Sequence, residues 1–158
     1  MHPDGAHLAY QSDHSGRLEV WIMNADGSNT RQVTNTGVTG HFLRWSENAR
    51  DVVFRCTCGG KPATMKVSID GSEPQPFIEM MGGSHISFSP DHSRIMDVVG
   101  HRVLWVSPVH DGKPEKAYEF PDPGVRIDYP VWSPDGKWVL FDRFRPQGGD
   151  IWSITGVE

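Results

Sequence analysis

Short stretches in which apolar and polar positions alternate follow one another along the whole chain. They are rich in β-branched and aromatic residues, and Gly, Pro, Asn and Asp separate them. Alternation with a period of two is typical of β-strands that have one buried face, and these four residue types favour tight turns. No stretch shows the 3.6-residue apolar stripe of an amphipathic helix. The pattern therefore predicts an all-β fold.

The turn sequences recur at a fixed interval. HPDG (residues 2–5), SENA (46–49), SPDH (89–92) and SPDG (133–136) follow one another at spacings of 44, 43 and 44 residues. A second marker, the Asp-Gly pair at 26–27, 70–71 and 111–112, keeps the same order relative to the first. The chain is therefore built from a repeat of about 44 residues.

Each complete repeat is expected to contain four short antiparallel strands, as in a β-propeller blade. The first repeat lacks its innermost strand and the last repeat lacks its fourth, so we expect 14 strands in about 3.6 blades. The expected blades of this single domain are 1–37 (partial), 38–82, 83–124 and 125–158 (partial). Trp45, Phe88 and Trp132 precede equivalent turns, while Trp21, Trp105 and Trp152 recur on third strands, and all six are expected to pack within or between blades.

Two stretches carry a family resemblance. EVWIMNADGSNTRQVTN (19–35) and PVWSPDGKWVLFDR (130–143) resemble the WD40-like repeat of the TolB family, also called the PD40 repeat. The resemblance covers nearly the whole chain and implies a propeller and a periplasmic or secreted location. The same blade occurs in TolB, in oligogalacturonate lyases, in propeller domains of prolyl-oligopeptidase-like peptidases and in sensor parts of bacterial regulators. It therefore implies a fold and leaves the function open.

About 3.6 blades do not close a ring, because a propeller needs at least four. Uncovered blade faces and strand edges at both ends would expose apolar surface and unpaired backbone groups. Two arrangements would cover them. The favoured one is a segment of a longer propeller of six to eight blades, and the alternative is self-association in which two chains complete one ring.

The innermost strands border the central channel, where a ligand site is expected. Aligning HFLRWS, SHISFS and DYPVWS places His41, Ser84 and Asp128 in one row and Phe42, His85 and Tyr129 in the next. The candidate ligand-binding residues are therefore His41, His85, Asp128 and Tyr129. Imidazole and carboxylate groups on one axis would suit a divalent metal or an anionic sugar.

The metal hypothesis uses His41, His85 and Asp128 as ligands. It gains support from the resemblance to the lyases, whose channel histidines hold a manganese-type ion, although their further His and Gln ligands are not found in order here. In the competing interpretation, His41 and His85 are hydrogen-bonded to neighbouring loops. The remaining histidines lie near turns and are expected to be exposed to solvent: His2, His7, His14, His92, His101 and His110.

Two further features of the sequence are candidate sites. Cys56 and Cys58 lie two apart on an expected strand, with Cβ atoms about 7 Å apart in regular geometry, so we expect free thiols. The loop DRFRPQGGD offers Arg143, Arg145 and Gln147 to a partner, although exposed charge in a long hairpin is usually only solvated.

Charge and absent motifs narrow the function. The chain has 15 basic and 20 acidic residues, for a net charge of −5, which argues against nucleic-acid binding. It contains no apolar run of about 20 residues, no signal-peptide-like start, and none of the G-x-S-x-G, Walker, G-x-G-x-x-G or H-E-x-x-H motifs. The favoured function is a non-catalytic module that binds a protein or small ligand without a cofactor. The alternatives are part of a lyase-like metal enzyme or the gating propeller of a serine peptidase.

Overall fold

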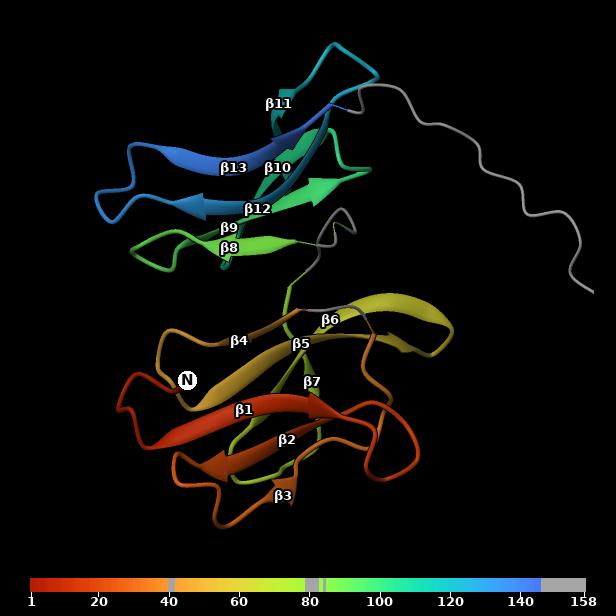
Figure 1. The fold of residues 1–158 in the computed structure, drawn as a ribbon, viewed down its shortest axis with the longest axis vertical. Coiled ribbons are helices and arrows are strands. Elements are labelled where there is room, and N and C mark those ends of the chain that lie inside the picture. The colour runs from red at the N-terminus through yellow and green to blue at the C-terminus, as the bar shows by residue number, and fades with distance from the viewer. Residues whose placement is uncertain (40–41, 79–82, 84, 146–158) are drawn as a thin grey trace, which may run out of the picture.

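The computed structural model describes residues 1–39, 42–78, 83 and 85–145. In this part of the chain, thirteen strands form four antiparallel sheets and there is no helix (Figure 1). It accordingly contains no helix long and apolar enough to cross a membrane. The fourteenth expected strand, at 150–154, lies outside the described residues.

In each sheet the strands are hydrogen-bonded to one another in chain order, as three- or four-stranded meanders in the first three sheets and as a hairpin in the described part of the fourth. The first sheet contains β1 (His7–Ser12), β2 (Glu19–Asn24) and β3 (Arg31–Gln32), and the second contains β4 (Leu43–Trp45), β5 (Asp51–Cys58), β6 (Lys61–Ser68) and β7 (Gln75–Pro76). The third contains β8 (Ile86–Phe88), β9 (Arg94–Val99), β10 (Val103–Pro108) and β11 (Glu115–Glu119), and the fourth contains β12 (Arg126–Trp132) and β13 (Val139–Phe144). In Figure 1 the first sheet lies at the bottom and the second above it, and the third and fourth sheets overlap at the top of the view.

The recurring turn explains the regular spacing of the sheets. In the fourth sheet, Ser133 Oγ donates to Asp135 Oδ1 at 2.6 Å and accepts the N–H of Trp138 at 2.9 Å. Ser89 and Asp91 repeat this arrangement in the third sheet, and Ser46 and Asn48 repeat it in the second. A hydroxyl and a short side-chain acceptor thus close each hairpin with the same register.

Three apolar clusters join successive sheets. The cluster between the first and second sheets contains Val20, Ile22, Val33, Val38, Val52, Phe54, Cys56 and Val67, and Trp45 packs against it. The cluster between the second and third sheets contains Phe42, Val53, Ile86 and Ile95, and Phe88 packs against it. The cluster between the third and fourth sheets contains Met96, Val98, Leu104, Val125 and Ile127, and Trp132 packs against it. The three aromatic residues that precede the turns therefore pack between sheets, as expected. Trp21 and Trp105 are half-buried, and Trp152 lies outside the described residues.

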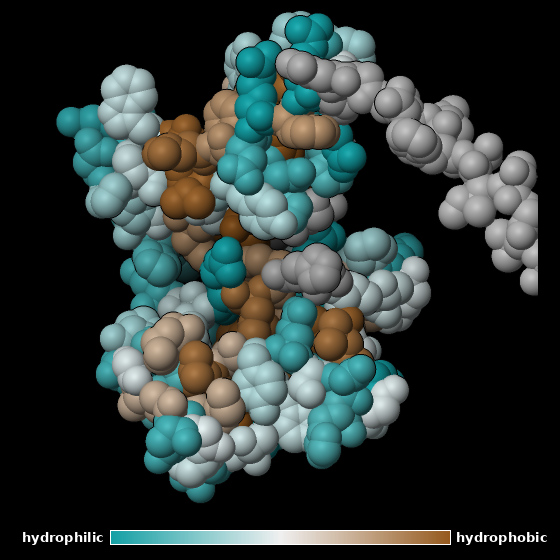
Figure 2. Space-filling model, in the orientation of Figure 1, coloured by the Kyte–Doolittle hydropathy of each residue, from teal (hydrophilic) through white to brown (hydrophobic). Residues whose placement is uncertain are grey.

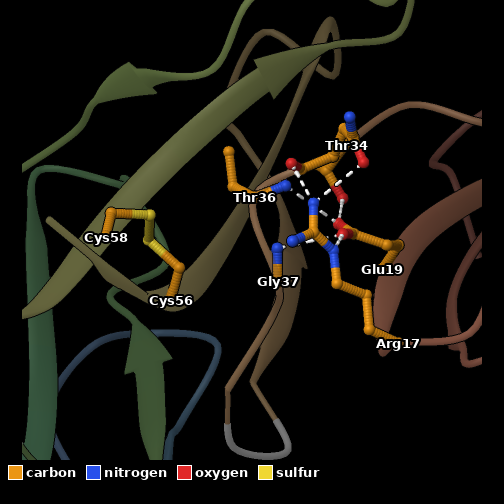
Figure 3. Close-up of a disulfide and its surroundings, with 8 residues drawn as sticks. Arg17, Glu19, Thr34, Thr36, Gly37, Cys56 and Cys58 are labelled. Carbon is orange, nitrogen blue, oxygen red and sulfur yellow. Dashed lines mark hydrogen bonds and ion pairs between the residues drawn. A yellow bond between two sulfur atoms is a disulfide. The ribbon is translucent and has the colours of Figure 1, made fainter. Parts of the chain in front are cut away.

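A buried carboxylate fastens the edge of the first sheet (Figure 3). Glu19 is fully buried, and it accepts hydrogen bonds from Arg17 Nε at 2.6 Å, Thr34 Oγ1 at 2.6 Å and the Gly37 N–H at 2.9 Å. Burial alone would raise the pKa of Glu19, but the hydrogen bonds from Thr34, Gly37 and Arg17 outweigh it and lower the pKa below the usual value. The loop after β3 is therefore held onto β2 by one anion.

Cys56 and Cys58 form a disulfide, so the expectation of free thiols is wrong (Figure 3). Their Cα atoms lie 5.4 Å apart, within the range that a disulfide requires and closer than in a regular extended strand. The pair lies at the end of β5, directly before Gly59 and Gly60, which both have positive φ. The strand contracts where it enters this turn, and the regular strand spacing used to predict free thiols does not hold there.

Candidate functional site

The described site lies where the first strand of the third sheet, β8, meets the first strand of the fourth, β12. Its residues are His85, His101, Asp128 and Tyr129, which we call the junction cluster. His85 and Asp128 come from the starts of two innermost strands, whereas His101 comes from the β9–β10 hairpin. Three separate segments therefore converge at one point.

Asp128 links the two histidines. Its Oδ1 atom lies 2.6 Å from His101 Nδ1, in a hydrogen bond, and 3.3 Å from His85 Nε2. The three side chains are partly buried, and the two imidazole centroids are 6.3 Å apart. A single carboxylate oxygen thus faces two imidazole nitrogens at the edge of the solvent.

The backbone of His101 is fixed by a tight turn. The Arg102 N–H donates to the Val99 carbonyl, and both central residues, Gly100 and His101, have positive φ, 59° and 56°. The N–H of Ile127 on β12 donates to the His101 carbonyl at 2.8 Å. The turn and the neighbouring sheet together hold His101 at the junction, although its φ is one that few residues other than glycine adopt.

Tyr129 occupies an irregularity in β12. The pairing of β12 with β13 shifts between Asp128 and Val131, and Tyr129 there has φ of 50°, which is uncommon for a bulky residue. Its ring packs on His85, with centroids 4.1 Å apart, yet the residue remains 61% exposed. The bulge therefore turns an aromatic ring outward beside the two histidines.

A hollow of about 110 Å³ adjoins the cluster. Its walls are Phe42, Arg44, His85, Ile86, Tyr129, Pro130 and Val131. Arg44 contributes a cation on the same side as the imidazole of His85 and the ring of Tyr129. One guanidinium cation, an imidazole and an aromatic face therefore border one small space, which suits an anionic or hydroxyl-bearing group.

The cluster also has the donor set of a metal site. One ligand atom each from His85, His101 and Asp128 lies within 4.8 Å of the other two. Two imidazole nitrogens and one carboxylate oxygen are ligands that Zn²⁺ and Mn²⁺ accept, with open positions left for water or substrate. The residue types therefore fit a divalent ion, with Asp128 exchanging its hydrogen bond to His101 for the metal.

The structure brings together three of the four ligand residues inferred from the sequence, namely His85, Asp128 and Tyr129. His41 lies outside the described residues, so its place in the site stays a prediction. His101 was expected to be exposed, which is wrong, because the fold packs it against Asp128. In an antiparallel meander, the hairpin between the second and third strands lies at the same end of the sheet as the start of the first strand. In the third sheet this places the β9–β10 hairpin, which contains His101, beside the start of β8, so strand direction alone could have indicated His101.

A second histidine group, made of His2, Asp4 and His7, belongs to the recurring turn. His2 stands where the other repeats have serine, and its Nδ1 lies 2.6 Å from Asp4 Oδ1. Its Nε2 lies 2.8 Å from the carbonyl oxygen of Ala49 in the next repeat. The His2 side chain is only 13% exposed, contrary to expectation, because it is used in joining two sheets.

The expected partner-binding loop is only partly described. Arg143 is exposed, and Arg145 forms an ion pair with Asp122, with 3.1 Å between Nη2 and Oδ2. Gln147 lies outside the described residues. The charge of Arg145 is therefore already paired within the chain, and the loop's role in partner binding stays a prediction.

The chain is similar to parts of longer proteins. No family model matches it. It is 24% identical over 144 residues to the uncharacterized protein Atu1656 of Agrobacterium fabrum, covering 91% of the chain and 38% of that protein. It is 26% identical over 143 residues to the uncharacterized peptidase YuxL of Bacillus subtilis, covering 88% and 20%. It is 30% identical over 155 residues to Tricorn protease homolog 1 of Streptomyces coelicolor, covering 87% and 14%. The chain thus spans less than two-fifths of each relative.

Solved structures match the arrangement of the sheets. The putative TolB of Agrobacterium tumefaciens superposes with a TM-score of 0.70 at 20% identity, covering 95% of this chain and 55% of that chain. TolB of Acinetobacter baumannii superposes with a TM-score of 0.64 at 16% identity, and the match covers 94% of this chain and 42% of that chain. The oligogalacturonate lyase of Vibrio parahaemolyticus superposes with a TM-score of 0.68 at 17% identity, and the match covers 87% of this chain and 42% of that chain. The all-β propeller fold expected from the repeat is confirmed, while membership of the PD40 family stays a prediction.

Proposed function

We propose that the chain is a non-catalytic TolB-like propeller segment whose junction cluster binds a small anionic ligand. The observation that carries this proposal is Tyr129, which is 61% exposed with positive φ and lies against His85. Unusual backbone conformations persist where the surrounding structure enforces them, and they are concentrated at functional sites. An exposed aromatic ring held in this way beside imidazoles is a binding surface.

The chemistry of the hollow favours an anionic sugar. The Tyr129 ring offers a face on which a sugar ring can pack, while the imidazole of His85 and the guanidinium of Arg44 can donate to carboxylate and hydroxyl groups. The Vibrio neighbour is an oligogalacturonate lyase, which makes galacturonate a suitable probe. A protein that presents an acidic side chain would use the same donors.

The experiment is an NMR titration of the ¹⁵N-labelled chain with galacturonate. We expect saturable shifts at residues around Tyr129, and at least tenfold weaker binding for Tyr129→Ala and for His85→Gln. Tyr118→Ala is the matched control, because Tyr118 is exposed on β11, away from the hollow. Shifts that do not saturate, or equal affinity of all variants, would refute binding at this site.

A metal-dependent enzyme is the second candidate, and the converging ligand atoms of His85, His101 and Asp128 support it. A bound divalent ion would act as a Lewis acid on a substrate carboxylate. Isothermal titration with Mn²⁺ and Zn²⁺ tests this function. Stoichiometric binding that is lost in His101→Ala and kept in His14→Ala would favour it, whereas equal binding by both variants would count against it.

A gating propeller of a peptidase is the third candidate. Two curated relatives carry peptidase names, YuxL and Tricorn protease homolog 1. This chain has no G-x-S-x-G motif, so a catalytic domain would have to be supplied by another part of the protein. Sequencing of the flanking coding region decides this candidate directly.

A periplasmic or secreted location accompanies the binding function in our proposal. The disulfide between Cys56 and Cys58 supports it, because disulfides persist in oxidising compartments. The TolB-like fold supports it independently. Fractionation of the native host, with antibody detection in the periplasmic or culture fraction, is the direct test.

A further inference from the structure

The fourth sheet has an apolar face that no other part of the described chain covers. Four large apolar side chains on β12, β13 and the turn before β13 are between 55% and 71% exposed, namely Val131, Trp138, Leu140 and Phe144. Val131 and Leu140 are cross-strand partners, so they share one side of the sheet. Hydrophobic side chains accordingly gather over β12 and β13 in Figure 2. An apolar patch of this kind marks an interaction surface.

The repeat shows what such a face contacts. Val53, Met96 and Leu140 each follow their turn serine by seven residues, so they occupy equivalent positions. Val53 is fully buried with Ile86 and Ile95 of the following sheet, and Met96 is 4% exposed in the cluster that joins the third sheet to the fourth. Leu140 is 65% exposed. This position therefore packs against a following sheet, and for Leu140 the described residues contain no such sheet.

The first sheet presents the matching half of the contact. Leu8 is equivalent to Val52 and Ile95, each fully buried against a preceding sheet. Leu8 itself is only half-buried, and its cross-strand partner is Met23. Tyr10 and Trp21 are also cross-strand partners, two positions further along, so they lie on the same side of the sheet as Leu8 and Met23. The first sheet thus offers an apolar face of the kind that fits the uncovered face of the fourth.

We propose that two copies of this chain associate head to tail, with the fourth-sheet face of each copy on the first-sheet face of the other. The same type of contact already occurs three times within the chain, between its successive sheets. Two copies also supply about one full propeller, because one copy covers 55% of the putative TolB chain. A two-fold axis then closes the ring with two identical junctions and leaves no free face. This inference does not rest on the ligand proposed above, and the two surfaces share Val131, which belongs to the fourth-sheet face and to the wall of the hollow.

The first measurement is the mass of the chain in solution, by light scattering or sedimentation between 1 and about 100 μM. We expect a dimer of about 35 kDa, twice the 17.7 kDa of the chain. A monomer throughout this range would overturn the proposal, since the faces would then await further blades of a longer protein. Larger open assemblies would also overturn it, because they contradict ring closure.

Charge substitutions test the head-to-tail pairing. Leu140→Lys and Leu8→Glu should each be monomeric, because a charge then lies in both junctions. When the two variants are mixed, one junction is unaltered and the other pairs Lys with Glu, so a 1:1 dimer should return. Tyr118→Lys, on an exposed site outside both faces, should remain dimeric.

The alternative surfaces give different results. If Leu140→Lys abolishes the dimer and Leu8→Glu does not, the fourth-sheet faces pair with each other and the proposed arrangement is wrong. If neither variant changes the mass, the dimer uses another surface and the arrangement is equally wrong. Far-ultraviolet circular dichroism of each variant confirms that its sheets are intact, so that loss of the dimer reports on the junction.

Discussion

The imidazole of His101 and the carboxylate of Asp128 lie 2.6 Å apart across the junction between the third and fourth sheets. The two residues are separated by 27 positions in the chain, and the backbone bond from Ile127 to the His101 carbonyl reinforces the same contact. This pair therefore contributes both to the candidate site and to the docking of one sheet on the next.

Removing either member should destabilise the junction. We expect a coupling free energy of about 1 kcal/mol between His101→Gly and Asp128→Ala, because a partly exposed charged hydrogen bond is worth that order. Glycine is chosen because it adopts the positive φ of residue 101 without cost. Urea unfolding of the two single variants and the double variant measures the coupling. Additive effects would show that the pair does not join the sheets.

Glu19→Gln should lower the free energy of unfolding by about 2–3 kcal/mol, because an amide cannot accept hydrogen bonds from all the donors that face this buried group. Folding lowers the pKa of Glu19, so the stability it contributes is complete above its unfolded pKa of about 4.3 and is lost as the pH falls through the lower native value. The difference between wild type and Glu19→Gln should therefore shrink in acid. Glu73→Gln, at an exposed position, is the control and should show no such difference.

The turn after β8 gives a second pH-dependent contribution. The hydroxyls of Ser89 and Ser93 and the Ser93 N–H donate to Asp91, and they lower the pKa of Asp91 to about 2. Its contribution is thus present above an unfolded pKa of about 3.9 and is lost as the pH falls toward 2.

Asp91→Asn should keep the turn and remove this pH dependence. Asn48 already fills the equivalent position in the second repeat, where it accepts from Ser46 Oγ and the Arg50 N–H. We therefore expect unfolding midpoints of wild type and Asp91→Asn to converge between pH 4 and pH 2. A constant gap over that range would show that the ionised carboxylate adds nothing to the turn.

The repeat spacing was enough to predict the sheets, because each turn sequence carries its own hydrogen bonds. Ser133 and Asp135 close a hairpin without help from distant residues, so the local sequence determines the register. The junction cluster was only half predictable. Strand alignment indicated His85 and Asp128, but His101 enters from a hairpin whose approach depends on how the third sheet packs on the fourth. The disulfide depended on a local contraction of β5, which strand periodicity does not report.

The disulfide itself gives the last prediction. Denatured, unreduced chain should take up no iodoacetamide, and reduction should expose two thiols, one each at Cys56 and Cys58. The bond closes a loop of only three residues, so chain entropy assigns it about 1–2 kcal/mol, less than most disulfides provide. Replacing both cysteines by serine should lower the free energy of unfolding by about this amount, plus the cost of a hydroxyl at the buried Cys56 position. The Cys58→Ser single variant separates the two effects, because it breaks the bond and leaves a thiol in the core. Two alkylated cysteines in protein that was never reduced would contradict the bond, and would return Cys56 to the role of a simple buried apolar residue.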